Sequence, residues 1–350
     1  MTTSADIPHS KLAVVIPAYN AGATLPACLA ALTQSRRRSD EIILFDDGSG
    51  DDTAEIARFY GAKVISGERP AKGPAAGRNL GAAAAAGSII VFVDADVEVG
   101  PEALGKLEAP IAAGRAVATF GSYDDSPKSR RIAALYANLR HHWVHQHGRT
   151  EAFTFWSGLG AIRADVFRAH GGFDTAFAKP SIEDIDLGIR IIESGGRIML
   201  VKDALGAHHK DWGVLQLWTT DIFQRAIPWA RLIKDKRGRA DDLNISRRER
   251  ASAVAAQLVV PALAAAAWNW NWWPAPAIAI GGYLALNANF LAFLYKHGGA
   301  RLAVAGSFLH WCYHIYASAT FLLVATGLLS QSARSKMIIA STGRTQATRP

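Results

Sequence analysis

The sequence predicts an α/β domain with a doubly wound, mostly parallel sheet, followed by an interfacial helix and by helices that span a membrane. Two observations lead to this prediction. Over the first 210 residues, short apolar runs alternate with segments of helical period, as in a sheet covered on both faces by crossover helices. From Ala251 to Tyr295, 45 residues pass without an Asp, Glu, Lys or Arg, which is enough for two crossings of a bilayer.

Strands and helices are expected to alternate along the α/β domain. We expect strands at 12–17, 41–45, 63–66, 88–93 and 198–202, and helices at 23–32, 52–60 and 75–86. Two of these strands end in acidic clusters: Asp46-Asp47 follows the second strand and Asp94-Ala95-Asp96 follows the fourth. Because such sheets bind ligands beyond the C-terminal ends of their strands, we expect the functional site there.

The Asp94-Ala95-Asp96 motif is the most informative short pattern in this domain. Two carboxylates just past a buried strand can hold a hard divalent cation, Mg²⁺ or Mn²⁺, together with a diphosphate. Taken alone, the motif also fits a turn or a helix cap, and Asp46-Asp47-Gly48-Ser49 also fits ordinary turn chemistry. The presence of both clusters at neighbouring strand ends favours a binding site.

The C-terminal third is predicted to form about three spans, at 252–269, 276–295 and 304–329. A turn rich in Trp and Pro, which suits the headgroup region, separates the first two. A buried helical hairpin of a soluble protein is the alternative. The chain is therefore divided into an α/β domain at 1–211, an amphipathic interfacial and basic segment at 212–250, a membrane region at 251–330 and a polar tail, expected to be disordered, at 331–350.

Charge predicts the orientation. Segment 231–250 has eight Lys and Arg against four Asp and Glu, whereas the Trp-rich turn has none, so the positive-inside rule places the N-terminal domain in the cytoplasm of a multi-pass plasma-membrane protein. With three spans, the C-terminus is expected outside. We expect no signal peptide, because residues 1–10 are polar and the first apolar run is short, and the two cysteines imply no disulfide framework. The net charge of +8 suggests contact with anionic lipid, and no pattern supports a nucleic-acid partner.

Several motifs together resemble those of family 2 glycosyltransferases, which have the GT-A fold. They are the segment 14–20 (VVIPAYN), Asp46-Asp47-Gly48-Ser49, the segment 77–81 (GRNLG) and Asp94-Ala95-Asp96, in that order. Downstream, 171–174 (GGFD) and 183–190 (EDIDLGIR) look like the acceptor-side motifs of the same family. The resemblance covers about residues 11 to 210. It implies an enzyme that moves a sugar from a nucleoside-diphosphate donor.

This resemblance assigns metal and donor roles. Asp96 is expected to be the main ligand of Mg²⁺ or Mn²⁺, and His208, favoured over His209, completes the metal shell. Asp94 is expected to touch the donor ribose or sugar.

Four further residues are expected to face the donor nucleotide. Asp47 accepts a hydrogen bond from the base, and Pro17 and Tyr19 form the wall of the base pocket. Arg78 meets the diphosphate, or else makes an ion pair on a helix surface. Without carboxylate support, the four histidines at 141–147 are interpreted as an amphipathic surface and not as a zinc site.

Glu183 and Asp184 bear on the acceptor. Inverting transfer to a hydroxyl needs a carboxylate that takes the proton of the attacking oxygen, and we assign that role to Asp184 with Glu183 as its neighbour. A helix cap or an ion pair with Arg190 is the structural alternative. The expected acceptor is a hydroxyl of a membrane lipid or lipid-linked saccharide. A polyprenyl phosphate, which needs no base, is the runner-up, and an inactive nucleotide-sugar-binding membrane scaffold is the alternative from another class.

Overall fold

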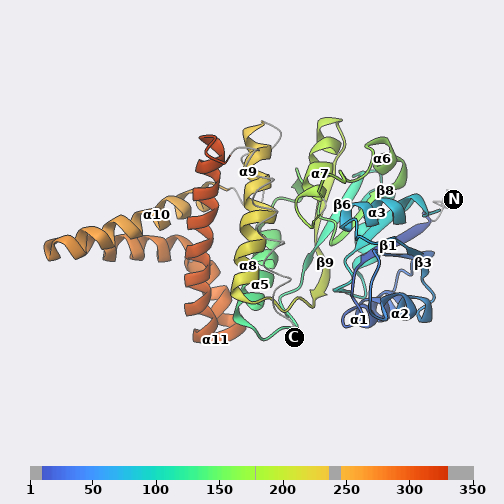
Figure 1. The fold of residues 1–350 in the computed structure, drawn as a ribbon, viewed down its shortest axis with the longest axis horizontal. Coiled ribbons are helices and arrows are strands. Elements are labelled where there is room, and N and C mark those ends of the chain that lie inside the picture. Colours follow the sequence, from blue (N-terminus) through green and yellow to red (C-terminus); the bar gives the residue numbers. More distant parts are fainter. Residues whose placement is uncertain (1–9, 178, 236–245, 330–350) are drawn as a thin grey trace, which may run out of the picture.

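The computed structural model describes residues 10–177, 179–235 and 246–329. An α/β unit containing a nine-stranded sheet lies at one end, and a pair of helices that run side by side projects from the other end (Figure 1). The helices between them form a layer that joins the two. The expected tail at 331–350 and residues 236–245 of the basic segment lie outside the described residues.

The first half of the sheet is parallel, as predicted. Strands β1 (Leu12–Ala18), β2 (Glu41–Asp46), β3 (Lys63–Ser66) and β4 (Ile89–Val93) alternate with helices α1 (Leu25–Gln34), α2 (Thr53–Phe59) and α3 (Pro74–Ala83). Each lies within three residues of its expected bounds. All five residues of β4 are buried, because helices cover both faces, and this explains the uninterrupted apolar run.

The second half makes the sheet mixed. It contains β5 (Val97–Val99), β6 (Ala118–Tyr123), β7 (Glu151–Ala152), β8 (Leu159–Arg163) and β9 (Ile198–His208), with the helices α4 (Ala103–Ala112), α5 (Ile132–His147), α6 (Ala164–Ala169) and α7 (Glu183–Glu193). The strand order is β3-β2-β1-β4-β8-β6-β9-β5, and β8 runs antiparallel to both of its neighbours. The strand expected at 198–202 continues to His208, because its far end pairs with β5.

The C-terminal helices begin with three short segments where one amphipathic helix was expected. They are α8 (Val214–Thr219), the π-helical segment η1 (Thr220–Ala226) and α9 (Ile227–Lys234). Two long helices follow, α10 (Arg247–Trp268) and α11 (Pro274–Ala325), with the short helix η3 (Trp270–Trp272) between them. Both long helices are apolar and long enough to cross a membrane.

Helix α11 consists of two parts with different directions. Its backbone leaves helical geometry at Gly298 and Gly299, and Gly299 has a φ of 65°, which a residue with a Cβ rarely adopts. The part before this turn packs against α10 and forms with it what we call the hairpin. The part after it, residues 300–325, is called the transverse helix because it runs across the hairpin and alongside α9 (Figure 1). Lys234 Nζ donates to the carbonyl of Val324 at 3.0 Å and ties the two together.

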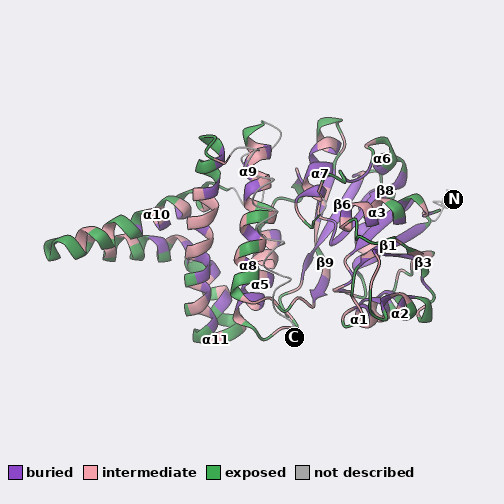
Figure 2. Ribbon diagram, in the orientation of Figure 1, coloured by how far each residue is buried: buried purple, intermediate pink, exposed green. Residues whose placement is uncertain are grey.

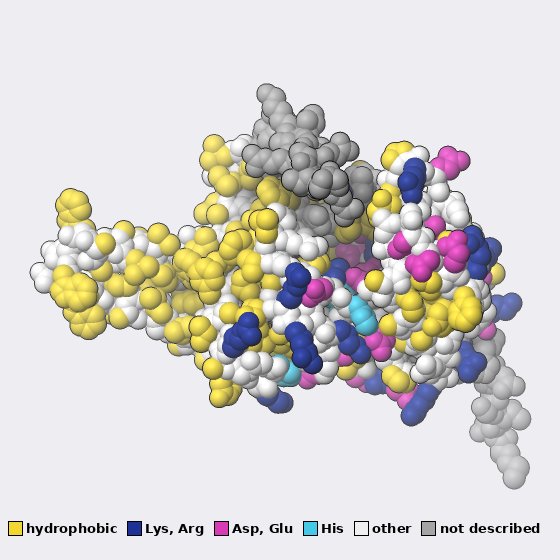
Figure 3. All heavy atoms as spheres, turned by 60° about the horizontal axis from the view of Figure 1, so that its bottom comes forward, with side chains coloured by type: hydrophobic (Ala, Val, Ile, Leu, Met, Phe, Trp, Pro, Cys, Tyr) yellow, Lys and Arg dark blue, Asp and Glu magenta, His cyan; other side chains and the backbone are white. Residues whose placement is uncertain are grey.

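The outer half of the hairpin is an exposed apolar arm. Figures 2 and 3 show that its residues are mostly exposed and that its surface is largely hydrophobic. Trp268 at its tip is 92% exposed, and Leu258 and Ile278 on its two helices are also exposed. The base of the hairpin is packed differently, since Tyr283, Phe290 and Leu294 are buried against α5 and the transverse helix.

Candidate active site

The pairing of β5 with β9 brings Asp96 and His208 together at the edge of the sheet. Val97 lies opposite His208 in an antiparallel register, and the amide of His209 donates to the carbonyl of Asp96 at 2.9 Å. The Nε2 atom of His208 lies 3.4 Å from Oδ2 of Asp96. Two residues separated by more than 100 positions therefore present one imidazole nitrogen and one carboxylate at the same point.

Asp96 and His208 have the chemistry of a cation site. Burial would raise the pKa of Asp96, but the positive charge of Lys210 and the contact with His208 outweigh it and hold that pKa below its usual range. Burial, and then Lys210, lower the pKa of His208, so its ring is neutral at pH 7. Nε2 of His208 is buried without a hydrogen-bond partner among the described residues, and the ring stacks on Tyr123 at 4.2 Å between centroids. An anionic oxygen beside an unpaired imidazole nitrogen fits a divalent metal ion.

His209 points to a different partner. Its Nε2 atom lies 2.9 Å from Glu98 Oε2, and Lys128 pairs with the same carboxylate at 3.1 Å. Of the two histidines, only His208 is directed toward Asp96.

Arg78 bridges two carboxylates from different motifs. Its Nη2 donates to Asp94 at 2.7 Å and its Nη1 donates to Glu183 at 2.9 Å. Burial would lower the pKa of Arg78, but the charges of Asp94 and Glu183 keep it above its usual value. The guanidinium is buried, so the alternative of a helix-surface ion pair does not describe it. Its Nε atom is buried and has no hydrogen-bond partner among the described residues.

Asp184 lies in the first turn of α7, next to the Arg78 bridge. Its Oδ2 accepts from the amide of Ser157 at 3.1 Å and from the Ser157 hydroxyl at 3.3 Å, while Oδ1 accepts from the amide of Ile185. Burial, and then the charge of Glu183, raise the pKa of Asp184 to about 7 against these hydrogen bonds. A carboxylate with that pKa can accept a proton near neutral pH. Glu183 itself is held by Arg78 and the amide of Ser181.

The residues expected at the nucleotide base are only partly free to reach it. Asp47 is buried, and its two carboxylate oxygens accept from the amides of Lys72 and Gly73 at 2.9 and 2.7 Å. Tyr19 is 57% exposed just past the end of β1, and Pro17 is half-buried. Asp46 accepts from the amide of Ser49 at 2.9 Å, which is the turn-stabilising role considered for it.

Direct contacts join the donor-side and acceptor-side motifs. The side chain of Asn79 accepts from the amide of Phe173 at 2.9 Å and donates to its carbonyl at 2.8 Å. Arg190 donates to Asp186 at 2.9 Å and to the carbonyl of Gly172 at 2.8 Å. These bonds hold the segment 171–174 between α3 and α7, and so fix the start of α7 relative to the strand ends.

Sequence reasoning missed two residues of this site. Ser157 and Tyr123 contact Asp184 and His208, but neither belongs to a motif whose spacing signals its partner. Lys210 follows His208 in a His-x-Lys motif and lies 4.0 Å from Asp96, a contact that the motif did not indicate. The interpretation of the histidines at 141–147 as a surface was wrong for His145. That ring is buried against Phe120 and bonds the carbonyl of Gly121 at 3.0 Å, because α5 packs on the end of β6.

The overall architecture is the GT-A fold. The structure resembles mannosyltransferase PcManGT from Pyrobaculum calidifontis in complex with GDP-Man and Mn²⁺, with a TM-score of 0.54 and 19% identity over 89% of this chain and 87% of that one. It also resembles GalNAc-T7 with UDP, GalNAc and Mn²⁺, with a TM-score of 0.50 and 19% identity over 70% and 51% of the two chains.

Residues 13–171, a little under half of the chain, match the model of glycosyl transferase family 2. The Mycobacterium tuberculosis (strain ATCC 25618 / H37Rv) protein named pre-mycofactocin glycosyltransferase is 30% identical over 220 residues, which cover 58% of this chain and 45% of that protein. The uncharacterized glycosyltransferase YibD of Escherichia coli (strain K12) is 39% identical over 95 residues, covering 26% and 28%. The chain thus spans less than half the length of these relatives.

Proposed function

We propose that this protein is a metal-dependent, inverting glycosyltransferase that moves a sugar from a nucleoside-diphosphate sugar to a hydroxyl of a membrane lipid or lipid-linked saccharide. The observation that carries the proposal is the meeting of Asp96 and His208 beside the Arg78 bridge and Asp184, at the C-terminal edge of the sheet. The Mn²⁺ and GDP-Man named with the mannosyltransferase of the same fold support this assignment.

Asp96 and His208 are the residues that would hold Mg²⁺ or Mn²⁺. When bound, the ion supplies positive charge that stabilises the diphosphate leaving group. Arg78 holds Asp94 in place through a 2.7 Å bond, so that the second oxygen of Asp94 can orient the donor ribose or sugar. Arg78 itself contributes through that bridge, because both of its Nη atoms donate to carboxylates and its Nε atom is buried.

We assign Tyr19 and Pro17 as the wall of the pocket for the nucleotide base, and we give Asp47 an indirect role in shaping that pocket. By bonding the amides of Lys72 and Gly73, Asp47 fixes the start of α3, and this loop closes the donor pocket. A hydrogen bond that Asp47 accepts directly from the base goes to an oxygen that already accepts one bond from a backbone amide.

Asp184 acts as the general base. The Ser157 amide and hydroxyl fill both acceptor positions of Oδ2, but Oδ1 accepts only from the amide of Ile185, so its second acceptor position can take the proton of an acceptor hydroxyl. Glu183 is a positioning residue, because Arg78 and Ser181 occupy its two oxygens.

The membrane region supports an amphiphilic acceptor. The outer half of the hairpin is apolar and exposed, and Leu215 and Phe223 are exposed on the neighbouring layer. We propose that the outer half of the hairpin inserts into the bilayer while the transverse helix, α8 and α9 lie in the interface, since the transverse helix runs across the hairpin (Figure 1). Beyond the transverse helix, residues 258–268 of α10 reach roughly 16 Å, which is less than the ~30 Å hydrocarbon core, so the arm enters the bilayer from one side and returns to it. The C-terminus then lies on the cytoplasmic side with the catalytic domain and not outside.

A direct contact connects this layer with the site. The Ser181 hydroxyl donates to the carbonyl of Gln224 in η1 at 2.7 Å. Ser181 lies only three residues before Asp184. The loop that carries the proposed base therefore rests on the segment proposed to lie at lipid level.

Transfer of labelled sugar to membrane lipids, measured with a panel of nucleotide sugars, tests the function. Asp184→Asn should lower transfer to a hydroxyl acceptor by about 10²- to 10⁴-fold and leave donor binding intact. Asp165→Asn, which changes a surface carboxylate paired with Arg163, should change neither. Transfer by Asp184→Asn at the wild-type rate would contradict the hydroxyl acceptor and indicate a phosphate acceptor instead. Donor binding without turnover on any acceptor would indicate a scaffold. Protease access to a C-terminal tag in sealed inside-out vesicles tests the topology, because a tag protected there contradicts a hairpin that returns to the cytoplasmic side.

A further inference from the structure

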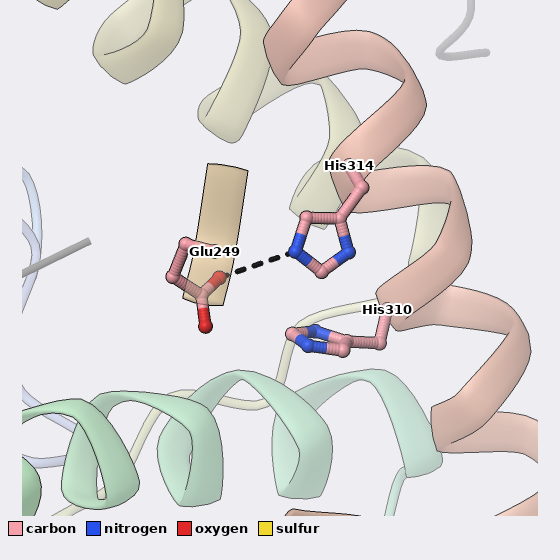
Figure 4. Close-up of side chains that lie close together, drawn as sticks. All are labelled: Glu249, His310 and His314. Atoms are coloured by element: carbon pink, nitrogen blue, oxygen red, sulfur yellow. Dashed lines mark hydrogen bonds and ion pairs between the residues drawn. The ribbon is translucent and has the colours of Figure 1, made fainter. Parts of the chain in front are cut away.

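A second cluster of ligand-type side chains lies where the hairpin meets the transverse helix. Glu249 comes from the first turn of α10, and His310 and His314 lie one turn apart on the transverse helix. One ligand atom from each lies within 4.8 Å of the other two. Figure 4 shows the three side chains converging from the two helices. Both histidines are buried, and Glu249 is half-buried.

Both histidine rings are fixed from behind by tyrosine hydroxyls. Nδ1 of His310 lies 2.9 Å from the hydroxyl of Tyr136, and Nδ1 of His314 lies 3.1 Å from the hydroxyl of Tyr283. A metal-binding histidine commonly uses its second nitrogen in this way, bonding an oxygen that sets the ring orientation. A tyrosine hydroxyl can accept from Nδ1–H, which leaves the Nε2 lone pair free for a metal ion.

The front of the cluster has spacing close to that of a small metal site. Nε2 of His314 lies 3.1 Å from Oε2 of Glu249. In a tetrahedral zinc site, bonds of about 2.0–2.1 Å put the ligand atoms roughly 3.3 Å apart. The ligand atoms of Glu249, His310 and His314 that lie furthest apart, within 4.8 Å, would come closer to that distance when their side chains rotate. Two histidines and a glutamate leave a fourth position for water, as in zinc sites with three protein ligands. The cavity lined by Glu249, His310, Asn287 and Tyr313 provides space for it.

Two arginines line the same cavity and oppose a cation there. Arg140 is neutralised by Asp221, with Nη2 to Oδ2 at 2.9 Å. Arg248 is exposed to solvent, and its Nε donates to the carbonyl of Leu286 at 2.7 Å. The charge of Arg140 is paired with Asp221 and that of Arg248 is screened by solvent, so neither arginine excludes a divalent ion coordinated by the anionic Glu249.

We propose that Glu249, His310 and His314 bind a divalent transition-metal ion of the zinc type, separate from the donor-site cation at Asp96. The ion adds a bridge between the base of the hairpin and the transverse helix, which also meet here through the contacts of His314 with Glu249 and Tyr283. This site does not rest on the proposed sugar transfer.

Metal content of the full chain in detergent tests the proposal. The protein is stripped with chelator, reloaded with Zn²⁺ and desalted, in wild type and in Asp96→Asn, which removes the main ligand of the other site. One equivalent of Zn²⁺ should remain in both, and Co²⁺ in its place should give the visible absorption of a tetrahedral complex. A chain that keeps no Zn²⁺ after reloading overturns the site and leaves a metal-free polar contact.

Ligand variants locate the ion. Glu249→Gln, His310→Gln and His314→Gln should each weaken Zn²⁺ binding by more than about 100-fold, because loss of a supporting outer-shell group alone costs 10- to 100-fold. Tyr283→Phe should fall within that smaller range.

His297→Gln is the matched control, since His297 is also on α11 and its Nε2 lies 3.1 Å from a carboxylate oxygen of Asp125. It should bind Zn²⁺ as the wild type does. Retention of wild-type affinity by Glu249→Gln together with either folded histidine variant refutes the assignment, and gel filtration identifies which variants are folded.

Discussion

The pKa of about 7 for Asp184 predicts how transfer depends on pH. If Asp184 is the base, it must be ionised to act, so kcat/KM should rise with pH and level off above neutrality. With a pKa of about 7, about 9% of the carboxylate is ionised at pH 6 and about 91% at pH 8, which gives roughly a tenfold rise in rate over that interval. An ordinary aspartate would give no rise there.

The assay is initial-rate transfer at saturating metal and varied donor between pH 5 and 9. Asp184→Asn should lose about 10²- to 10⁴-fold in rate and lose the acidic limb as well, because no group remains to take the proton. Ser157→Ala is the finer test. This variant removes the hydrogen bond from the Ser157 hydroxyl to the ionised carboxylate of Asp184, which raises the pKa of Asp184 further. The acidic limb of the pH profile should therefore move to higher pH while activity persists. A flat profile from pH 5 to 8, or an Asn variant as fast as the wild type, would refute the assignment.

The same shift predicts an effect on stability. The folded-state pKa of Asp184 is raised, so the folded chain binds a proton that the unfolded chain has released between pH 4 and 7. The cost of keeping this carboxylate buried therefore grows as pH rises through 7 and is absent at low pH. Asp184→Asn should raise the melting temperature more at pH 8 than at pH 5, and an equal change at both would contradict a raised pKa.

Three further predictions concern other parts of the molecule. Asp96→Asn should fold but lose Mn²⁺-dependent donor hydrolysis, and full activity of this variant in EDTA would exclude the metal role. Arg78→Met should destabilise the fold by about 3–5 kcal/mol, since it leaves the buried Glu183 without its partner, and a urea titration within 1 kcal/mol of wild type would contradict that. Replacing residues 258–282 by a short turn should release the protein from carbonate-washed membranes, because these exposed residues form the apolar arm. Ending the chain at residue 250 should instead cause aggregation, because it exposes Leu217 and Tyr136.

The parallel half of the fold could be predicted because its signals are local. The strand at 63–66 has the expected bounds, and the bounds of β1, β2 and β4 differ from the expected ones by one residue at one end. Their apolar runs are continuous because both faces of the sheet are covered. Strands β5, β6, β7 and β8 were not predicted, and of these β5 has only three residues and depends on pairing with β9.

The site was predictable in composition but less so in arrangement. Asp96 and His208 were selected by motif resemblance, but their 3.4 Å approach depends on the register of β5 with β9. The two bonds from Ser157 to Asp184 join a loop to a helix 27 residues away, and no spacing rule signals them. Likewise, apolar composition identified residues 304–329 as a helix of spanning length, but composition does not set direction. The turn at Gly298 and Gly299 does.

The position of the proposed base is linked to the membrane layer through buried polar contacts. Asp221 in η1 accepts from Arg140 of α5 at 2.9 Å and from the hydroxyl of Tyr316 on the transverse helix at 2.7 Å. Three residues further along, Gln224 accepts from Ser181, which precedes α7. A buried ion pair is costly to break, so α5, η1 and the transverse helix are expected to move as one unit. If the transverse helix rests on lipid, as we propose, the bilayer fixes the height of η1 and, through Ser181, the height of the proposed base above the membrane. An acceptor held at that depth by its own lipid would then reach Asp184 without a separate binding domain.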